Sequence, residues 1–266
     1  MDRATWIGLT VALAIAGGGV WYYKALHRTP PPQTATVLGV EPATPAPAEP
    51  AAEAPPEQFP VPQPAADAPP LPPLAQSDGP VARALTSVFG QRLEPLLIPK
   101  SLVRNIVATV DSLDRGAVAL RLRPLAYVTG QPGLETEAGV LVLSPRNYER
   151  YAPLIALLQA ADAQRIAELY LRHYPLFQRA YEELGYPGRS FNDRLVAVID
   201  HLLQAPEPTS PVALVRPKVL YEYDDPELEE RSSGQKILVR IGPRNAVLVK
   251  EKLRAIRAAL AASGAR

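Results

Sequence analysis

The N-terminal part of the chain is a long apolar run. The 20 residues from Ala4 to Tyr23 include no charged side chain. A helix of this length spans about 30 Å, which matches the hydrocarbon core of a bilayer. Trp6 lies near one end of the run and Trp21 near the other, as aromatic residues do at the two membrane interfaces. Residues 4–23 are therefore predicted to form a transmembrane helix in contact with the lipid bilayer.

A cleaved signal peptide is the alternative interpretation of this run. Small residues at Ala12, Ala14 and Ala16 follow a short apolar stretch and the positive Arg3, which is typical of a cleavage region. The apolar residues nevertheless continue to Tyr23, past any such site. This continuation favours a retained, single-pass anchor.

The charges beside the anchor give opposing indications of its orientation. Lys24 and Arg28 follow the apolar run and only Arg3 precedes it, so a count of basic residues places the domain in the cytoplasm. However, the tail before the helix is very short, and the chain from Arg28 to Pro73 adds no further positive charge. We favour an anchor in a bacterial inner membrane with a periplasmic soluble domain, and a cytoplasm-facing domain remains the alternative.

Residues 24–73 are rich in proline and alanine. Sixteen prolines fall between Pro30 and Pro73. Such a segment cannot bury a core or donate a regular ladder of hydrogen bonds, so it is predicted to be a disordered, partly polyproline II linker. Fully extended at about 3.1 Å per residue, it reaches on the order of 130 Å. Either the linker holds the domain away from the bilayer, or it is a plain connector of untuned length.

Residues 74–263 show the pattern of a helical domain. Apolar residues recur at helical spacing over residues 81–93, 102–113, 148–158, 166–184, 195–203 and 246–260. Asp78 is the expected N-cap of the first helix, and Pro175 is expected to kink the longest helix or split it in two. Lys250 is expected outside the apolar stripe of the last helix.

Two regions have the shorter period of β-strands. Between Ala117 and Leu143, apolar residues alternate with small or charged ones around two glycines, which predicts a small hairpin or two short strands. Another strand is expected at about Val219–Tyr223. The predicted fold class is therefore mainly α (α+β): a helical domain with a small β-hairpin or short strands.

Composition excludes several classes of function. The domain holds 25 Lys and Arg against 21 Asp and Glu without a basic stripe, so no nucleic-acid partner is expected. The absence of cysteine excludes thiolate chemistry and Cys-ligated metals. The acidic stretch Glu222–Glu230 lacks the spacing of a calcium loop and is interpreted as a solvated turn before a short helix. No metal or cofactor is predicted.

Catalysis by histidine has few candidates in the domain. Only His173 and His201 lie there, and His173 shares an apolar stripe that favours a hydrogen-bonded core position. His201 lies on the polar face of its helix, where a solvated surface position is the simpler interpretation. No familiar nucleophile or metalloprotease motif occurs. A hydrolase of unrecognised type that uses His201 with Asp193 or Asp200 is the alternative function.

The segment from Gly185 to Arg194 combines turn, aromatic, cationic and amide groups. Tyr186, Arg189, Asn192 and Asp193 could form a recognition loop there. The alternative is a connection between helices, with Asn192 or Ser190 as N-cap, a buried Phe191 and an ion pair between Asp193 and Arg189.

Several long strings in the domain resemble one bacterial family. They are Tyr174–Gly188, Phe191–Leu195, Ile199–Leu203, Arg216–Tyr221, Ser233–Lys236 and Gly242–Asn245. In these strings the chain is similar to the family called domain of unknown function 3014, over roughly residues 71–262. The resemblance implies an N-terminal membrane segment and a proline-rich linker before the domain. Because the family has no assigned activity, it implies no catalytic residue.

These observations favour a non-enzymatic cell-envelope protein over an enzyme. The domain is expected to act as a binding or scaffold domain, displayed on a flexible tether, for an unknown protein or cell-wall partner. The expected contact surface is formed by Tyr186, Arg189, Asn192 and Asp193, with Arg216, Lys218 and Lys236.

Overall fold

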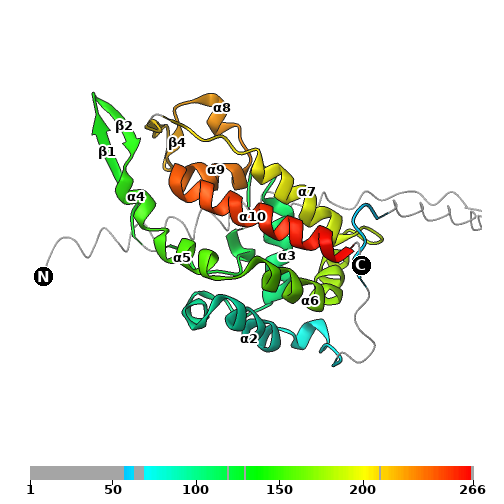
Figure 1. Cartoon of the computed structure of the whole chain (residues 1–266). Helices are drawn as coiled ribbons and strands as arrows, with labels where there is room; N and C mark the ends of the chain where they lie inside the picture. Colours follow the sequence, from blue (N-terminus) through cyan, green and yellow to red (C-terminus); the bar gives the residue numbers. More distant parts are fainter. Residues whose placement is uncertain (1–56, 63–68, 119, 129, 210, 265–266) are drawn as a thin grey trace, which may run out of the picture. The chain divides into compact units, whose positions relative to one another are not determined.

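The computed structural model describes residues 57–62, 69–118, 120–128, 130–209 and 211–264. These residues are mainly helical, which confirms the predicted fold class for the domain (Figure 1). The predicted transmembrane helix at residues 4–23 and most of the predicted linker lie outside the described residues. Among the helices that are described, none is long and apolar enough to cross a bilayer.

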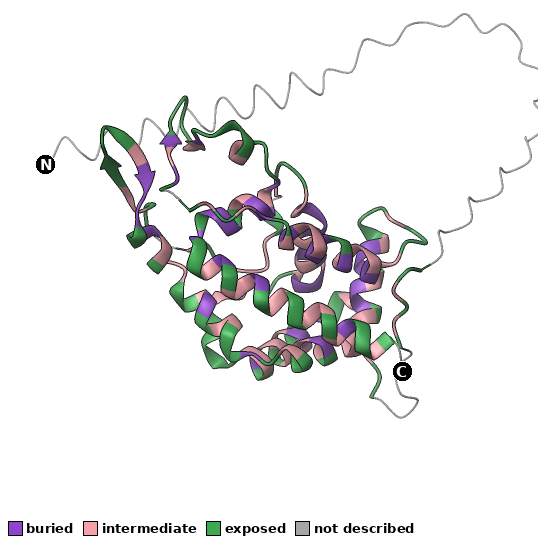
Figure 2. Ribbon diagram, turned by 45° about the horizontal axis from the view of Figure 1, so that its top comes forward, coloured by how far each residue is buried: buried purple, intermediate pink, exposed green. Residues whose placement is uncertain are grey.

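The helices of the domain pack around two long central ones. The described helices are α2 (Asp78–Phe89), α3 (Leu102–Ser112), α4 (Pro145–Glu149), α5 (Ala152–Ala160), α6 (Ala163–Glu183), α7 (Phe191–Leu203), α8 (Pro226–Glu229), α9 (Ser233–Arg240) and α10 (Pro243–Gly264), with short 3-10 turns at Leu74–Gln76, Gln91–Leu96 and Leu120–Leu122. The two long central helices are α6 and α10. Helix α10 packs against α5, α6, α7 and α9, and α6 also packs against α2 and α3. Figure 2 shows buried residues concentrated where these helices face one another.

Two small antiparallel hairpins accompany the helices. Strands β1 (Leu134–Glu137) and β2 (Val140–Leu143) pair with Leu134 opposite Leu143. Ala138 and Gly139 form the turn, both with positive φ, at 48° and 86°. The hairpin predicted before Leu143 is thus confirmed.

The second hairpin is smaller than the strand pattern indicates. Strands β3 (Leu214–Val215) and β4 (Glu222–Tyr223) have two residues each. The expected strand over Val219–Tyr223 is therefore wrong in its first part, because Val219 and Leu220 extend into solvent, 76% and 75% exposed. The alternation near Leu120 is likewise not a strand but a 3-10 turn.

The largest buried cluster of the described residues lies between α2, α3, α6, α7 and α10 and includes four aromatic side chains. Tyr170, Phe177, Tyr181 and Phe191 contact one another there, with ring centroids 5.4 to 6.4 Å apart where they pair. Because Tyr170 precedes Pro175 in α6 and Phe177 and Tyr181 follow it, their packing in one cluster holds α6 as one helix. The predicted split at Pro175 is therefore wrong.

Some helix ends differ from the sequence prediction. Asp78 does not cap its own helix: its carboxylate accepts hydrogen bonds from the backbone N–H groups of Ser101 and Leu102, 2.7 Å each, at the start of α3. The helix expected over residues 148–158 is interrupted, so that α4 and α5 are separate. Helix α9 has no counterpart in the prediction.

Lys250 is buried rather than on the polar side of α10. Its side chain is 5% exposed, and its ammonium donates to the Ala205 carbonyl at 2.7 Å and to the Glu207 carboxylate at 2.5 Å. The neighbouring Lys252 donates to the Ala161 carbonyl at 2.5 Å. Cations placed on the carbonyls that follow α7 and α5 satisfy groups that the helices leave unpaired.

Because several tyrosines are buried, we expect the folded domain to lose stability in alkaline solution. Burial raises the pKa of Tyr170 and of Tyr181, and that of Tyr223 to about 12. A neutral phenol is favoured in the folded state, so its contribution is complete below the unfolded pKa of about 10 and is lost as the pH rises through the folded value. For Tyr223 the difference between the folded and unfolded pKa values corresponds to a contribution of roughly 2–3 kcal/mol to the free energy of unfolding.

The measurement is the free energy of unfolding by urea at pH 8, 10 and 11. We expect it to fall between pH 10 and 11, and to fall less steeply in Tyr223→Phe. Tyr127→Phe is the control, because Tyr127 is 56% exposed. An equally steep decline in all three proteins would contradict the assignment to Tyr223.

Candidate functional site

The loop before α7 is a rigid connection rather than a free recognition loop. Gly185 and Gly188 take positive φ angles of 111° and 70°, which allow the sharp turns. The Ser190 hydroxyl accepts a hydrogen bond from the backbone of Asp193 at 3.2 Å and so caps α7. Phe191 is 1% exposed. Of the two N-caps left open by the sequence, Ser190 is the one observed.

Tyr186 is half-buried at the surface of the domain and joins a charged network. Its ring stacks on Tyr181 with centroids 4.6 Å apart. Its hydroxyl accepts a hydrogen bond from Arg115 at 2.8 Å, and this bond raises the pKa of Arg115. These contacts hold the loop on α6 and on the end of α3.

The same network centres on Arg194 of α7. Its guanidinium donates to the carboxylate of Asp111 at 2.8 Å and to that of Asp114 at 2.6 Å. The Asp111 side chain is only 6% exposed. The hydrogen bond from Arg194 lowers the pKa of Asp114, and Arg194 itself is held charged because its pKa is raised. The network fastens α7 to the end of α3.

Asn192 and Asp193 bind another part of the chain. We call residues 57–62 the tether segment. The backbone N–H groups of Gln58 and Phe59 donate to the two oxygens of the Asp193 carboxylate, at 3.0 and 2.8 Å. The side-chain amide of Asn192 donates to the Phe59 carbonyl at 2.8 Å. The expected ion pair between Asp193 and Arg189 is therefore not formed, and the carboxylate serves backbone donors.

The tether segment lies in a groove between α7 and the end of α10. We call the residues that line it on the domain side the tether groove: Asn192, Val196, Arg257, Leu260, Ala261 and Gly264. A cavity of about 220 Å³ lies between them and residues 58–60. Figure 1 shows the segment beside the C-terminal end of α10.

Arg257 and Gly264 shape the groove. The Arg257 guanidinium lies 6.0 Å from the centre of the Phe59 ring, and the Asp200 carboxylate orients it through bonds of 2.5 and 2.9 Å. A Cβ added to Gly264 would come within 2.8 Å of the Pro60 carbonyl, so the absence of a side chain admits the segment. Arg257 therefore offers a cation to an aromatic residue of the bound segment.

The other basic candidates lie elsewhere. Arg189 is exposed, and its guanidinium has no hydrogen bond or ion pair within the described residues. Arg216 lies over the Tyr221 ring at 5.3 Å, and Lys236 bonds Glu229 at 2.6 Å between α8 and α9. Lys218 is exposed. Across the described residues, no hydrogen bond or ion pair joins these four side chains to the tether groove.

The residues of the hydrolase alternative do not converge. The Nε2 atom of His201 lies 2.8 Å from the hydroxyl of Ser232, which caps α9. Asp200 binds Arg257, and Asp193 binds the tether segment. Within the described chain, neither carboxylate is hydrogen-bonded to His201.

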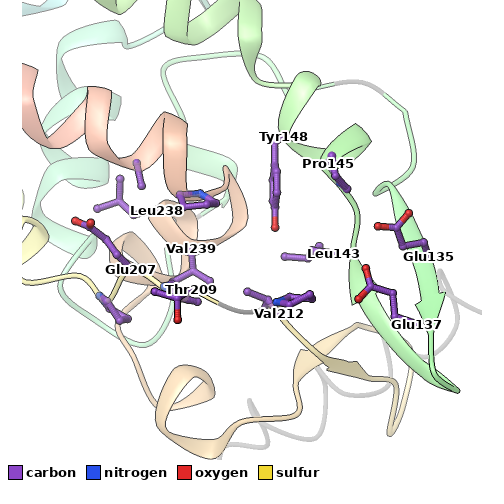
Figure 3. A pocket seen from close by; sticks show the side chains of 15 residues that line it. Glu135, Glu137, Leu143, Pro145, Tyr148, Glu207, Thr209, Val212, Leu238 and Val239 are labelled. Carbon is purple, nitrogen blue, oxygen red and sulfur yellow. The ribbon is translucent and has the colours of Figure 1, made fainter.

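A second cavity lies beside the first hairpin, between α4, α9 and the loop after α7. Its volume is about 270 Å³ (Figure 3). Leu143 and Val212 form part of its apolar wall, and Glu135 and Glu137 of β1 line its outer side. The Tyr148 hydroxyl points into it, and its pKa is raised by burial and by the charge of Glu135. No three side chains of the described residues are grouped to hold a metal ion.

Sequence reasoning missed the tether segment and Arg257 as parts of the site. The prolines around residue 59 are typical of a spacer, and Arg257 is one of several basic residues on α10. One signal was available: Phe59 is the only aromatic residue between Thr29 and Pro73. An aromatic side chain is the one large apolar group of this spacer that could contribute substantial contact area by packing against the domain.

Comparison with known proteins gives one family. A model described as "Protein of unknown function (DUF3014)" matches residues 102–257. The matched interval holds Asn192, Asp193 and Arg257 but not the tether segment. No curated protein and no solved structure matches the chain.

Proposed function

The chain belongs to the DUF3014 family of proteins of unknown function, and we propose that its folded domain is a non-enzymatic binding domain for a short polypeptide segment. The tether groove is the binding site. The tether segment occupies it in this chain and shows how a segment is held.

The observation that carries the proposal is recognition of the main chain. One carboxylate accepts from two consecutive N–H groups, at Gln58 and Phe59, and the amide of Asn192 donates to the carbonyl of Phe59. The backbone bends at Gln58 and Phe59, which lets both N–H groups face one carboxylate. Such bonds require this backbone shape but little particular sequence, and bonds to a charged acceptor contribute about 1.5–3 kcal/mol each. The half-buried Phe59 ring beside Arg257 supplies selectivity for an aromatic residue.

The chemistry of the groove supports a polypeptide partner more than a cell-wall glycan. Backbone N–H groups in register with a carboxylate belong to proteins and peptides, and a sugar chain has no such pair. Recognition of a peptide through its main-chain groups, with a pocket for one side chain, is a recurring mode of peptide binding.

The proposed setting is a cell envelope. Residues 4–23 would anchor the chain in a bacterial inner membrane, and the tether would display the domain in the periplasm. The apolar run and the proline-rich composition support this setting. A reporter enzyme that is active only outside the cytoplasm, fused after Arg266, tests it. A silent reporter would favour a cytoplasm-facing domain.

Removal of the Asp193 carboxylate should abolish most of the binding. The test uses the full-length chain in detergent, with residues 57–62 replaced by Gly-Ser-Gly-Ser-Gly-Ser to empty the groove. We call this chain the tether-replaced variant. A fluorescent peptide with the sequence of residues 57–62 is the ligand. In this background Asp193→Ala should weaken binding at least about tenfold, because two charge-assisted hydrogen bonds are lost at a partly exposed site.

Fluorescence anisotropy gives the dissociation constants. Asp224→Ala is the matched control, since it removes an exposed carboxylate that accepts no hydrogen bond in the described part of the chain. Circular dichroism confirms that each variant is folded. Equal affinities of the Asp193 and Asp224 variants, or no peptide binding to the tether-replaced variant, would refute the proposed function.

A further inference from the structure

Asn192 has a polar atom that the tether segment does not satisfy. The residue is 5% exposed, and its amide nitrogen is used by the Phe59 carbonyl. Its Oδ1 atom is buried and has no hydrogen-bond partner within the described residues. A buried acceptor without a donor costs about 1–3 kcal/mol.

A cavity lies beside this residue. Asn192 lines the cavity of about 220 Å³ between the tether segment and the groove. Gln58 and Pro60 are exposed, and only Phe59 and Val61 are half-buried. The segment thus fills the groove incompletely and leaves one buried acceptor unpaired.

The short connection between the tether segment and the domain explains how a segment that fills the groove incompletely stays bound. The Pro69 carbonyl accepts a hydrogen bond from Arg172 of α6, and only residues 63–68 separate it from the tether segment. A ligand on so short a connection has an effective concentration in the millimolar range. A weak intrinsic affinity therefore suffices for docking.

We propose that the tether segment is an exchangeable, self-inhibiting occupant, and that the partner is a segment of another polypeptide with an aromatic residue followed by proline. The partner also carries a hydrogen-bond donor that reaches Oδ1 of Asn192. This inference rests on the proposed function of the groove. The docked segment excludes weakly binding ligands from the groove, and a segment that donates a hydrogen bond to Oδ1 of Asn192 displaces it.

Competition is measured with the fluorescent peptide of residues 57–62. The full-length wild-type chain should bind it at least about tenfold more weakly than the tether-replaced variant. The factor follows from an effective concentration of about 1 mM and an intrinsic dissociation constant of about 100 μM or less. A chain with the same Gly-Ser replacement at residues 43–48 controls for the change in composition, and it should bind like the wild type.

The outcomes separate the two proposals. Binding to the tether-replaced variant with the same affinity as to the wild type would overturn the exchange and leave the binding function standing. Absence of binding to both would overturn the binding function itself. Weak binding to the wild type with tight binding to the tether-replaced variant supports both.

A position scan tests the donor to Asn192. Peptides of residues 57–62 that carry serine, asparagine or lysine at each position except 59 and 60 are measured against the tether-replaced variant. At least one should bind about 5- to 10-fold more tightly than the unchanged peptide. In Asn192→Ala that gain should disappear. If no peptide gains affinity, or if the gain persists without Asn192, the assignment of Oδ1 to the partner is wrong.

Discussion

Replacement of Arg194 by methionine should lower the free energy of unfolding by about 3 kcal/mol. The change keeps most of the aliphatic volume and removes the cation between Asp111 and Asp114. The Asp111 side chain is 6% exposed, so its carboxylate would remain buried with only the exposed Arg115 as an ion-pair partner. Loss of one partner of a buried ion pair costs about 3–5 kcal/mol, and the partial exposure of Asp114 reduces this.

Acidity provides an internal check of this result. The pKa of Asp114 is lowered in the folded state by Arg194, so its contribution is present above the unfolded pKa of about 3.9 and is lost as the pH falls further. The difference between wild type and Arg194→Met in urea unfolding should therefore shrink from pH 7 to pH 3. Arg189→Met, on the exposed side of the loop, should be nearly neutral at both values. A constant difference would refute the electrostatic cause.

Substitution of Gly242 by alanine should cost about 3 kcal/mol as well. Gly242 connects α9 to α10 with φ at +89°, which an alanine adopts at a cost of about 1–2 kcal/mol. A Cβ there would also lie 2.4 to 2.7 Å from three ring atoms of Tyr148. Displacement of that ring adds about 1–3 kcal/mol of overpacking.

Thermal unfolding measures this effect, with an expected fall of about 6–12 °C in the melting temperature. Gly116→Ala is the matched control, because a Cβ at Gly116 meets no atom within 4 Å and its φ is not positive. Tyr148→Ala should relieve part of the clash, so the double variant should lose less than the sum of the single changes. A full sum would show that backbone strain alone is responsible.

The long helices could be predicted because one periodic stripe dominates each of them. In α3, α6 and α7 the same residues that repeat at helical spacing are those buried in the domain, including Val107, Phe177 and Ile199. Helix α9 escaped because it is short and begins with Ser233, Gly234 and Gln235, whose burial depends on contacts distant in sequence.

Capping by a distant residue is likewise invisible to local patterns. Asp78 has the composition of a local N-cap, but its carboxylate is used by α3, more than twenty residues away. Lys250 is charged and so was placed outside the apolar stripe, but it is buried because the carbonyl of Ala205 and the carboxylate of Glu207 surround its ammonium. In both cases the partner comes from tertiary packing.

The site was partly predictable. A concentration of turn, amide and charged groups indicated Asn192 and Asp193, which lie in the tether groove, and Tyr186, which instead supports the loop. The ligand could not be inferred, because composition describes the average behaviour of a linker and not the docking of residues 58–60. Arg257 joins the groove only through the packing of α10 on α7.

Docking of the tether segment also shortens the connection between residue 57 and the domain. While residues 58–60 lie in the groove, residue 57 is held beside the domain. In the proposed exchange, release makes residues 58–68, which are 11 residues, available as a connection to Pro69. At about 3.1 Å per residue in an extended chain, they add about 34 Å of reach. The proposed exchange of one bound segment for another would therefore lengthen the connection between residue 57 and the domain at the moment when the partner binds.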